Sequence, residues 1–89
     1  MSDNIYEELE KEYGTLVVRS VPNNATVIVD SFDRITSISK LTPAIFDLIG
    51  KEKPYRITVK MKGYEDFIHK ILIQKGTEIK IKAVLTKMN

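Results

Sequence analysis

Few side chains in this 89-residue sequence are of the types that catalyse reactions or bind metal ions. His69 is the single histidine, and it alternates with apolar residues in an extended segment, which is typical of a partly buried structural residue. The acidic pairs Asp30 with Asp33 and Glu65 with Asp66 fall in turn-like segments, and turn chemistry explains them without general acid–base work. We therefore predict a protein that is not an enzyme.

The sequence also lacks the motifs that hold phosphate or activate a nucleophile. It has no glycine-rich phosphate loop, no nucleophile elbow and no HExxH pattern. It has no cysteine, which excludes disulfide bonds and cysteine-ligated zinc or iron–sulfur sites. We predict no catalytic, cofactor-binding or metal-binding residues, and no cofactor.

Charge is unevenly distributed, although the net charge is only +2. Residues 1–13 carry five acidic side chains and one lysine, whereas residues 51–89 carry ten basic side chains and four acidic ones. Such a split indicates an acidic element lying near a basic one, or a basic face offered to a partner. An ordinary solvated surface of mixed charge is the alternative.

A basic face is the basis of a nucleic-acid hypothesis. Five basic residues project from the polar sides of two predicted strands and would contact phosphates if those strands were neighbours: Arg56, Lys60, Lys62, Lys80 and Lys82. Proteins that bind single strands usually add exposed aromatic residues for base stacking. The nearby aromatic residues, Tyr55, Tyr64 and Phe67, are predicted to point inward or to be structural. Nucleic-acid binding is therefore the second hypothesis, behind protein interaction.

Residues 31–41 form the candidate partner interface. This segment is too polar and irregular for a core strand, and we predict a long loop. Loops on rigid β scaffolds often carry binding residues, and the candidates here are Phe32, Arg34, Ile35 and Ile38. In the alternative, Phe32 and Ile35 tuck under the edge of the domain as a plug, so the exposure of Phe32 decides between the two.

The element that positions these residues is the segment 54–64. Its residues alternate between apolar and polar from Tyr55 to Lys62, which predicts a strand with one buried face. Pro54 begins the segment, where its missing N–H costs little. Gly63 ends it, at a position suited to positive φ. We predict that this is the central strand of a small β domain.

The remaining segments predict an all-β fold, a small antiparallel sandwich of six or seven short strands. Strands are expected near 15–21, 25–30, 44–48, 55–62, 67–74 and 78–86, with the first two forming a hairpin around Pro22-Asn23-Asn24. The predicted core contains Val27, Val29, Ile57, Val59, Ile71, Ile73, Ile79 and Ile81.

Residues 1–13 are predicted to be an acidic helix or arm. Asn4 and Glu7 resemble a capping box, and Ile5, Leu9 and Tyr13 share one helix face. That face could cover outward-pointing apolar residues, of which Leu72 and Val84 are the candidates. A frayed tail is the alternative. The predicted organisation is thus an arm at 1–13, a β domain at 14–86 and a tail at 87–89.

A series of short motifs, in order, resembles the PEGA domain family. They are Gly14-Thr15-Leu16, Pro22-Asn23-Asn24-Ala25, Val27-Ile28-Val29-Asp30, Thr42-Pro43, Gly63-Tyr64, Gly76 and Leu85. The chain departs from the family pattern in two places. Asn23-Asn24 replaces Glu-Gly in the Pro-Glu-Gly-Ala turn, and Ser31 replaces the glycine that normally follows the aspartate, with a longer path to Thr42.

The resemblance implies a non-catalytic β-sandwich that serves as an interaction or scaffolding module, through protein–protein contacts or in envelope-associated assemblies. It transfers no ligand and no active site. Self-association or a protein partner is expected. No run approaches the roughly 18 apolar residues that span a membrane. We expect a cytoplasmic location if the chain is full-length, and the cell envelope if it is a domain of a larger protein.

Overall fold

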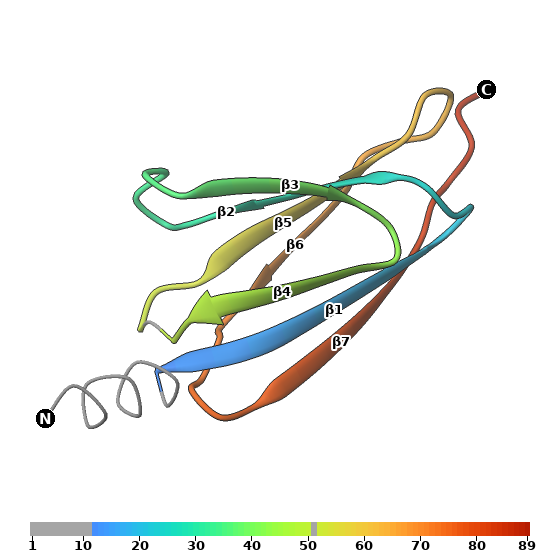
Figure 1. Cartoon of the computed structure of the whole chain (residues 1–89). Helices are drawn as coiled ribbons and strands as arrows, with labels where there is room; N and C mark the ends of the chain where they lie inside the picture. Colours follow the sequence, from blue (N-terminus) through green and yellow to red (C-terminus); the bar gives the residue numbers. More distant parts are fainter. Residues whose placement is uncertain (1–11, 51) are drawn as a thin grey trace, which may run out of the picture.

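The computed structural model describes residues 12–50 and 52–89, and these form seven β-strands (Figure 1). The strands are β1 (Tyr13–Val21), β2 (Thr26–Asp30), β3 (Ser37–Leu41), β4 (Ala44–Ile49), β5 (Tyr55–Lys60), β6 (Phe67–Ile71) and β7 (Glu78–Val84). The all-β prediction is confirmed for this part of the chain.

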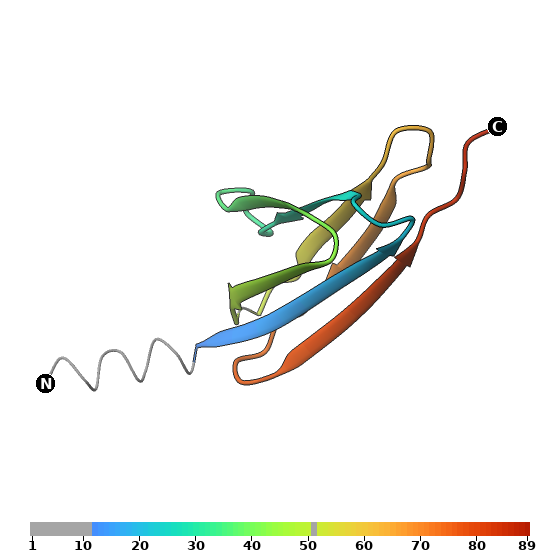
Figure 2. The ribbon, with the colours of Figure 1, turned by 45° about the vertical axis from the view of Figure 1, so that its right-hand side comes forward.

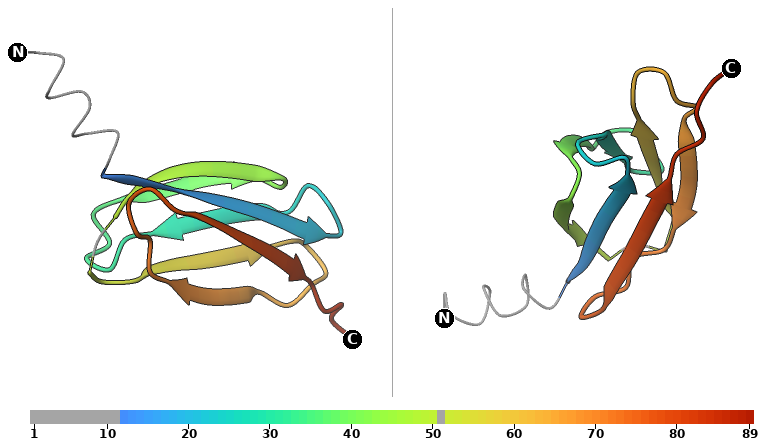
Figure 3. Two further views of the ribbon diagram at one scale, coloured as in Figure 1. Left: turned by 90° about the horizontal axis from the view of Figure 1, so that it is seen from below. Right: turned by 90° about the vertical axis from the view of Figure 1, so that its right-hand side faces the viewer.

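The strands form two sheets, which Figure 2 shows as two layers. Sheet A has the order β4-β1-β7, and sheet B has the order β3-β2-β5-β6. Strand β1 runs parallel to β7, and Figure 3 shows the two side by side and pointing the same way. The other pairs of described strands are antiparallel, so the prediction of a wholly antiparallel sandwich is wrong for this one pair.

The core lies between the sheets and follows from the alternation along the strands. Val27 and Val29 of β2 and Ile57 and Val59 of β5 are buried, as predicted, because their alternating neighbours point to the outer face of sheet B. The other predicted core residues are buried (Ile73) or partly buried against the core (Ile71, Ile79 and Ile81). The core also holds residues that were not predicted as core: Leu16, Val18, Ala25, Ala44, Phe46, Leu48, Ala83 and Leu85. Tyr55, which was predicted to point inward or to be structural, is buried there too.

Strand β5 is interior to sheet B, between β2 and β6. It ends at Lys60, two residues earlier than predicted. Gly63 has φ of 87°, so the expectation of a left-handed glycine after this strand is confirmed. The interior position agrees with the prediction of a central strand.

The predicted hairpin between residues 15–21 and 25–30 is wrong. Strand β1 pairs with β4 and β7, so both of its edges are occupied within sheet A. The turn after β1 therefore carries the chain across to sheet B, where β2 pairs with β3 and β5. Asn24 in that turn has φ of 64°, as its turn chemistry suggested.

Half of the predicted loop at 31–41 is a strand. Strand β3 covers Ser37–Leu41 and pairs only with β2, at the edge of sheet B. Ile38 is the one residue of β3 that packs against the core, while the other four are exposed. An edge strand with a single inward apolar side chain has a weak alternation signal, which explains why the sequence did not reveal it.

Two hydroxyl groups join the β1–β2 turn to the connection between β3 and β4. The buried Thr42 Oγ1 lies 2.5 Å from Ser20 Oγ and accepts a hydrogen bond of 2.9 Å from the backbone N–H of Ala25. Ser20 Oγ donates to the carbonyl of Pro22 at 2.7 Å. The Pro-x-x-Ala and Thr-Pro motifs are therefore the two sides of one corner between the sheets.

The predicted tail, residues 87–89, contacts the β5–β6 turn. The N–H of Met88 donates to the carbonyl of Gly63 at 2.9 Å, and just before the tail the carbonyl of Thr86 accepts from the N–H of Glu65 at 2.8 Å. The segment after β7 therefore joins sheet A to a turn of sheet B.

The predicted N-terminal helix lies outside the described residues, except at its end. Tyr13, which was assigned to the helix face, instead begins β1. The proposed covering of Leu72 and Val84 by that helix also lies outside the description, and both side chains are exposed. None of the described segments is a helix long and apolar enough to cross a membrane.

Candidate functional site

The β2–β3 loop, residues 31–36, is held in shape by its own hydrogen bonds. Ser31 is buried, and its N–H donates to the carbonyl of Thr36 at 2.9 Å while its hydroxyl accepts from the N–H of Thr36 at 3.1 Å. The Asp33 carboxylate accepts from the Ser31 hydroxyl at 2.5 Å and from the N–H of Ile35 at 3.1 Å. Arg34, which has φ of 62°, donates its N–H to the Ser31 carbonyl at 2.9 Å.

This loop presents two large apolar side chains to solvent. Phe32 is 59% exposed and Ile35 is 83% exposed. The Nζ of Lys53, from the β4–β5 connection, lies 4.4 Å from the centroid of the Phe32 ring, a cation–π geometry. The alternative in which Phe32 and Ile35 plug the edge of the sandwich is wrong, since both are more than half exposed and neither packs against the described core.

Ile38 does not join this group. It lies in β3 opposite Val29, whose side chain is in the core, and it is partly buried against that core. Directly opposed residues of an antiparallel pair share a face, so Ile38 points inward. Of the four predicted interface residues, the loop brings together Phe32, Arg34 and Ile35, and Ile38 serves the core instead.

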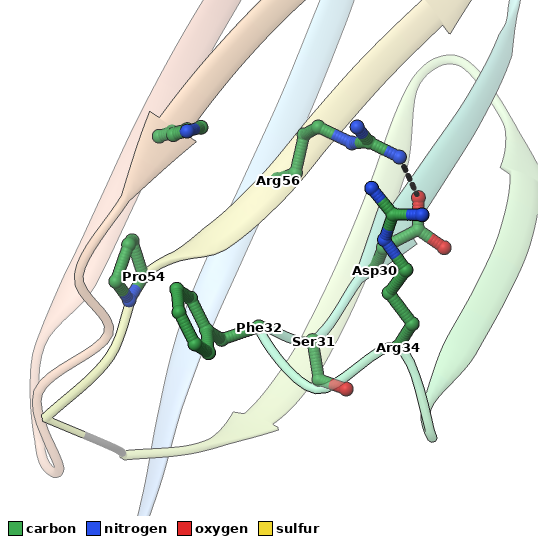
Figure 4. Close-up of a pocket in the computed structure, with 7 residues that line it drawn as sticks. Asp30, Ser31, Phe32, Arg34, Pro54 and Arg56 are labelled. Carbon is green, nitrogen blue, oxygen red and sulfur yellow. Dashed lines mark ion pairs between the residues drawn. The ribbon is translucent and has the colours of Figure 1, made fainter.

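A small pocket lies beside the loop, on the outer face of sheet B (Figure 4). Its volume is about 140 Å³, and it is lined by Asp30, Ser31, Phe32, Arg34, Pro54, Arg56 and Lys70. The strand register explains the charged part of the lining, because Asp30 lies opposite Arg56, and Arg56 lies opposite Lys70. The pocket unites two predicted interface residues, Phe32 and Arg34, with one predicted basic-face residue, Arg56.

The two arginines reach the pocket from different elements. Arg56 comes from β5, and its guanidinium lies 3.6 Å from the Asp30 carboxylate. Arg34 comes from the loop, and in Figure 4 its side chain also extends toward Asp30. Phe32 and Pro54 form the apolar side of the pocket, with the Phe32 ring beside the proline. Asp30, Pro54 and Lys70 were not predicted as site residues, since only the register between β2, β5 and β6 shows that they meet.

The predicted basic face is not continuous. Arg56 and Lys60 belong to β5 in sheet B, whereas Lys80 and Lys82 belong to β7 in sheet A. Lys62 lies in the turn after β5. The polar faces of the two strands are on opposite outer sides of the sandwich, so the condition that they be neighbours is not met.

Two of these lysines also have acidic neighbours. The Lys60 Nζ lies 3.3 Å from the Asp66 carboxylate, and the Lys80 Nζ lies 3.8 Å from the Glu78 carboxylate. Both pairs are largely exposed, so their contribution to stability is small. They reduce the positive charge available to a phosphate backbone.

The residues considered for catalysis are dispersed. His69, which was interpreted as a partly buried structural residue, is instead exposed on β6 at the edge of sheet B, with its ring centroid 6.2 Å from that of Phe67. Within residues 12–50 and 52–89, no group of three His, Cys, Asp or Glu side chains is placed to hold a metal ion. Burial raises the pKa of the Tyr55 hydroxyl, and the charge of Asp33 and the nearby Tyr13 raise it further. That hydroxyl donates to the carbonyl of Ile49 at 2.7 Å.

Two facing sheets, a Thr-Pro corner and a structured β2–β3 loop define a small β-sandwich module. The PEGA domain family matches residues 13–89, and the chain belongs to this family. A solved structure titled "The Bacillus anthracis TIE protein" contains a similar fold, with a TM-score of 0.58 at 18% identity. The match covers 85% of this chain but only 16% of that one. No curated protein matches the chain.

Proposed function

We propose that this chain is a non-catalytic protein-interaction module that docks on its partner through the β2–β3 loop. The observation that carries the proposal is the exposure of Ile35 and Phe32, at 83% and 59%, on a loop whose backbone is held by internal hydrogen bonds. Complete burial of such a side chain contributes about 1.5–3 kcal/mol. A preformed loop also loses little entropy on binding.

Neither apolar side chain is needed to close the loop. The hydrogen bonds that hold its shape come from Ser31 and Asp33, together with backbone groups. Aromatic residues and arginine are enriched at the energetic centres of protein interfaces, and Phe32 and Arg34 flank Asp33 in this loop. The composition of the exposed positions therefore favours a protein partner.

The family and the small share of the related structure that the chain covers support a module within a larger assembly. We extend the proposal to scaffolding in the cell envelope, which fractionation of cells that express this protein would test. No observation of similar strength supports nucleic-acid binding, because the lysines of the predicted basic face are divided between two sheets.

The test uses matched isoleucine variants. Ile35→Ser removes the exposed loop side chain, and Ile45→Ser removes an isoleucine that is 60% exposed on β4, in the other sheet. Partners captured by crosslinking are identified and purified, and their affinity for the wild type and each variant is measured, with self-association followed by sedimentation velocity.

We expect Ile35→Ser and Phe32→Ser to weaken association by about tenfold or more each while leaving the melting temperature nearly unchanged. Ile45→Ser should leave association unchanged. Equal behaviour of Ile35→Ser, Phe32→Ser and Ile45→Ser in association would refute the proposal. So would a loss of association that is explained by a large fall in melting temperature.

A further inference from the structure

The pocket on the outer face of sheet B carries more positive charge than its own carboxylate neutralises. Three of its lining residues are basic, Arg34, Arg56 and Lys70, and one is acidic, Asp30. Asp30 is 3.6 Å from Arg56. Within the described residues, neither Arg34 nor Lys70 forms an ion pair. The pocket therefore has a net positive charge that a bound anion would offset.

Two of the basic residues form a like-charged cross-strand pair. Arg56 and Lys70 lie directly opposite each other on β5 and β6, and like charges in such a cross-strand pair destabilise a sheet. Arg34 also lines this pocket, so a ligand carboxylate bound there would gain charge-assisted hydrogen bonds and offset the like charges.

The size and walls of the pocket limit the ligand. Its volume of about 140 Å³ is below the range of roughly 300–1,000 Å³ found for sites of drug-sized molecules. It has room for one carboxylate-bearing group. Phe32 and Pro54 form an apolar wall next to the basic groups (Figure 4). A peptide in which an apolar residue adjoins a carboxylate fits both parts.

We propose that this pocket binds a carboxylate of a peptide, with Arg34 and Arg56 donating to its oxygens, Lys70 adding charge and the neighbouring apolar residue packing on Phe32 and Pro54. The inference deepens the proposed function of the β2–β3 loop and rests on it. A peptide is favoured over a nucleic acid because the cluster is a single row of the sheet with Asp30 within it, and no second basic row continues it.

The experiment is an NMR titration of the 15N-labelled chain with synthetic peptides. One end-blocked peptide carries a single glutamate between two leucines, and a second has glutamine in place of the glutamate. A third has no acidic side chain but a free C-terminal carboxylate next to leucine. A short oligothymidylate is the nucleic-acid probe. The backbone signals of residues 30–34, 56 and 70 and the arginine side-chain signals report on the pocket.

We expect the glutamate peptide, the free-carboxylate peptide or both to shift these signals with a dissociation constant on the order of a millimolar, and to bind less at high ionic strength. Binding by only one of the two identifies a side-chain or a terminal carboxylate as the source. The glutamine peptide should shift them little.

Substitutions of the charged pocket residues test whether these side chains bind the peptide or only stabilise the fold. Arg34→Asn removes the guanidinium while keeping a residue that tolerates the left-handed backbone, and Lys70→Gln removes a cation from an exposed edge position. Each should weaken binding, by about tenfold for Arg34→Asn. The matched control Lys82→Gln, in sheet A, should have no effect. Asp30→Asn should tighten binding, because it removes a competing carboxylate, and a purely structural role of this residue would not produce that change.

The inference is overturned if neither carboxylate peptide shifts the pocket signals, if the glutamine peptide binds equally well, or if oligothymidylate binds these residues more tightly than the peptides do. These outcomes are distinguishable from failure of the proposed function. If Ile35→Ser keeps full partner affinity while the glutamate peptide still binds the wild-type pocket, the loop proposal fails and the carboxylate site stands.

Discussion

At the scale of single residues, the hydroxyl groups of Ser20 and Thr42 have a defined direction of donation. Ser20 donates to the Pro22 carbonyl, so the proton shared between the two hydroxyls comes from Thr42. Thr42 Oγ1 is then free to accept from the N–H of Ala25. Each hydroxyl uses its single proton once, and all of these groups lie at the corner between the two sheets.

Thr42→Val tests this corner because it keeps the shape of the side chain and removes the hydroxyl. The Ala25 N–H and the Ser20 hydroxyl would each lose a partner in a buried site, and an unsatisfied buried group costs about 1–3 kcal/mol. We expect a loss of stability of that size in urea denaturation. Thr42→Ser, which retains the hydroxyl, should lose much less. Equal losses in the two variants would show that the methyl group, and not the hydrogen bonds, matters here.

Tyr55 couples stability to alkaline pH. Its hydroxyl donates to the Ile49 carbonyl at 2.7 Å, so Tyr55→Phe should cost about 0.5–1.5 kcal/mol at neutral pH. Burial raises the pKa of Tyr55 above its ordinary value of 10.0, with Asp33 and Tyr13 adding to the shift. The unfolded phenol therefore ionises first, and the stability that depends on the neutral hydroxyl, present below pH 10, is lost as the pH rises through the folded pKa.

The difference in unfolding free energy between the wild type and Tyr55→Phe should consequently shrink as the pH rises past 10.0, the ordinary tyrosine pKa. Urea denaturation of both proteins at neutral pH and just above pH 10 measures it. Taking the difference removes the common effect of the other titrating groups. A difference that stays constant or grows with pH would contradict the expected direction of the shift.

At the scale of elements, a close approach of another segment explains why the second residue of β1 is a glycine. A Cβ atom at Gly14 would lie 2.6 Å from the carbonyl oxygen of Gln74 and 2.7 Å from Cγ2 of Ile73. Both residues belong to the connection between β6 and β7, which crosses from sheet B to sheet A. This position of β1 therefore has no room for a side chain.

Gly14→Ala should destabilise the chain by about 1–3 kcal/mol, since the added methyl group meets a backbone oxygen that cannot easily move. Gly76→Asn is the control. Gly76 has φ of 77° with open space around the Cβ position, and asparagine tolerates that conformation. Thermal denaturation should show a clear loss for the first variant and a small one for the second. If Gly14→Ala melts like the wild type, the connection is not packed against β1 as described.

The alternation of apolar and polar residues made some strands predictable from the sequence, but other strands lack it and were missed. The buried faces of β2 and β5 followed from Val27, Val29, Ile57 and Val59, which a period of two places on one side. Strand β3 was missed because Ile38 is its only inward apolar side chain. The assignment of β1 and β2 to different sheets also could not be foreseen, since pairing partners distant in the chain determine it.

In the candidate site, too, some residues could be predicted from the sequence and others could not. Local composition pointed to Phe32 and Ile35, because large apolar residues stand out in a polar loop, and Arg34 lies between them in the sequence. Their meeting with Arg56 depends on a register in which Asp30 lies opposite it, and no local pattern encodes that register. The separation of Lys80 and Lys82 from Arg56 likewise depends on which sheet each strand joins.

At the scale of the whole molecule, the two sheets are tied together at one end of the sandwich by the segment that follows β7. The carbonyl of Thr86 accepts from the N–H of Glu65, and the N–H of Met88 donates to the carbonyl of Gly63. These two hydrogen bonds pair Lys87 with Tyr64 in an antiparallel bridge. The β1–β2 turn and the Thr42 corner lie at the same end, and the β2–β3 loop with its pocket lies at the opposite end (Figure 1). The candidate site is thus remote from these ties, so they can be altered without touching it.

Removal of residues 86–89 tests whether these ties hold the sheets together. Loss of these two backbone hydrogen bonds at a partly exposed site should lower the unfolding free energy by about 1–2 kcal/mol. Amide exchange of Glu65 should accelerate more than exchange of Val29 or Ile57 in the core, because Glu65 loses its acceptor directly. Removal of Asn89 alone is the control and should change little. Partner affinity should be unaffected by either deletion, because the β2–β3 loop is at the other end. If deletion of residues 86–89 leaves both stability and Glu65 exchange unchanged, the segment after β7 does not join the sheets.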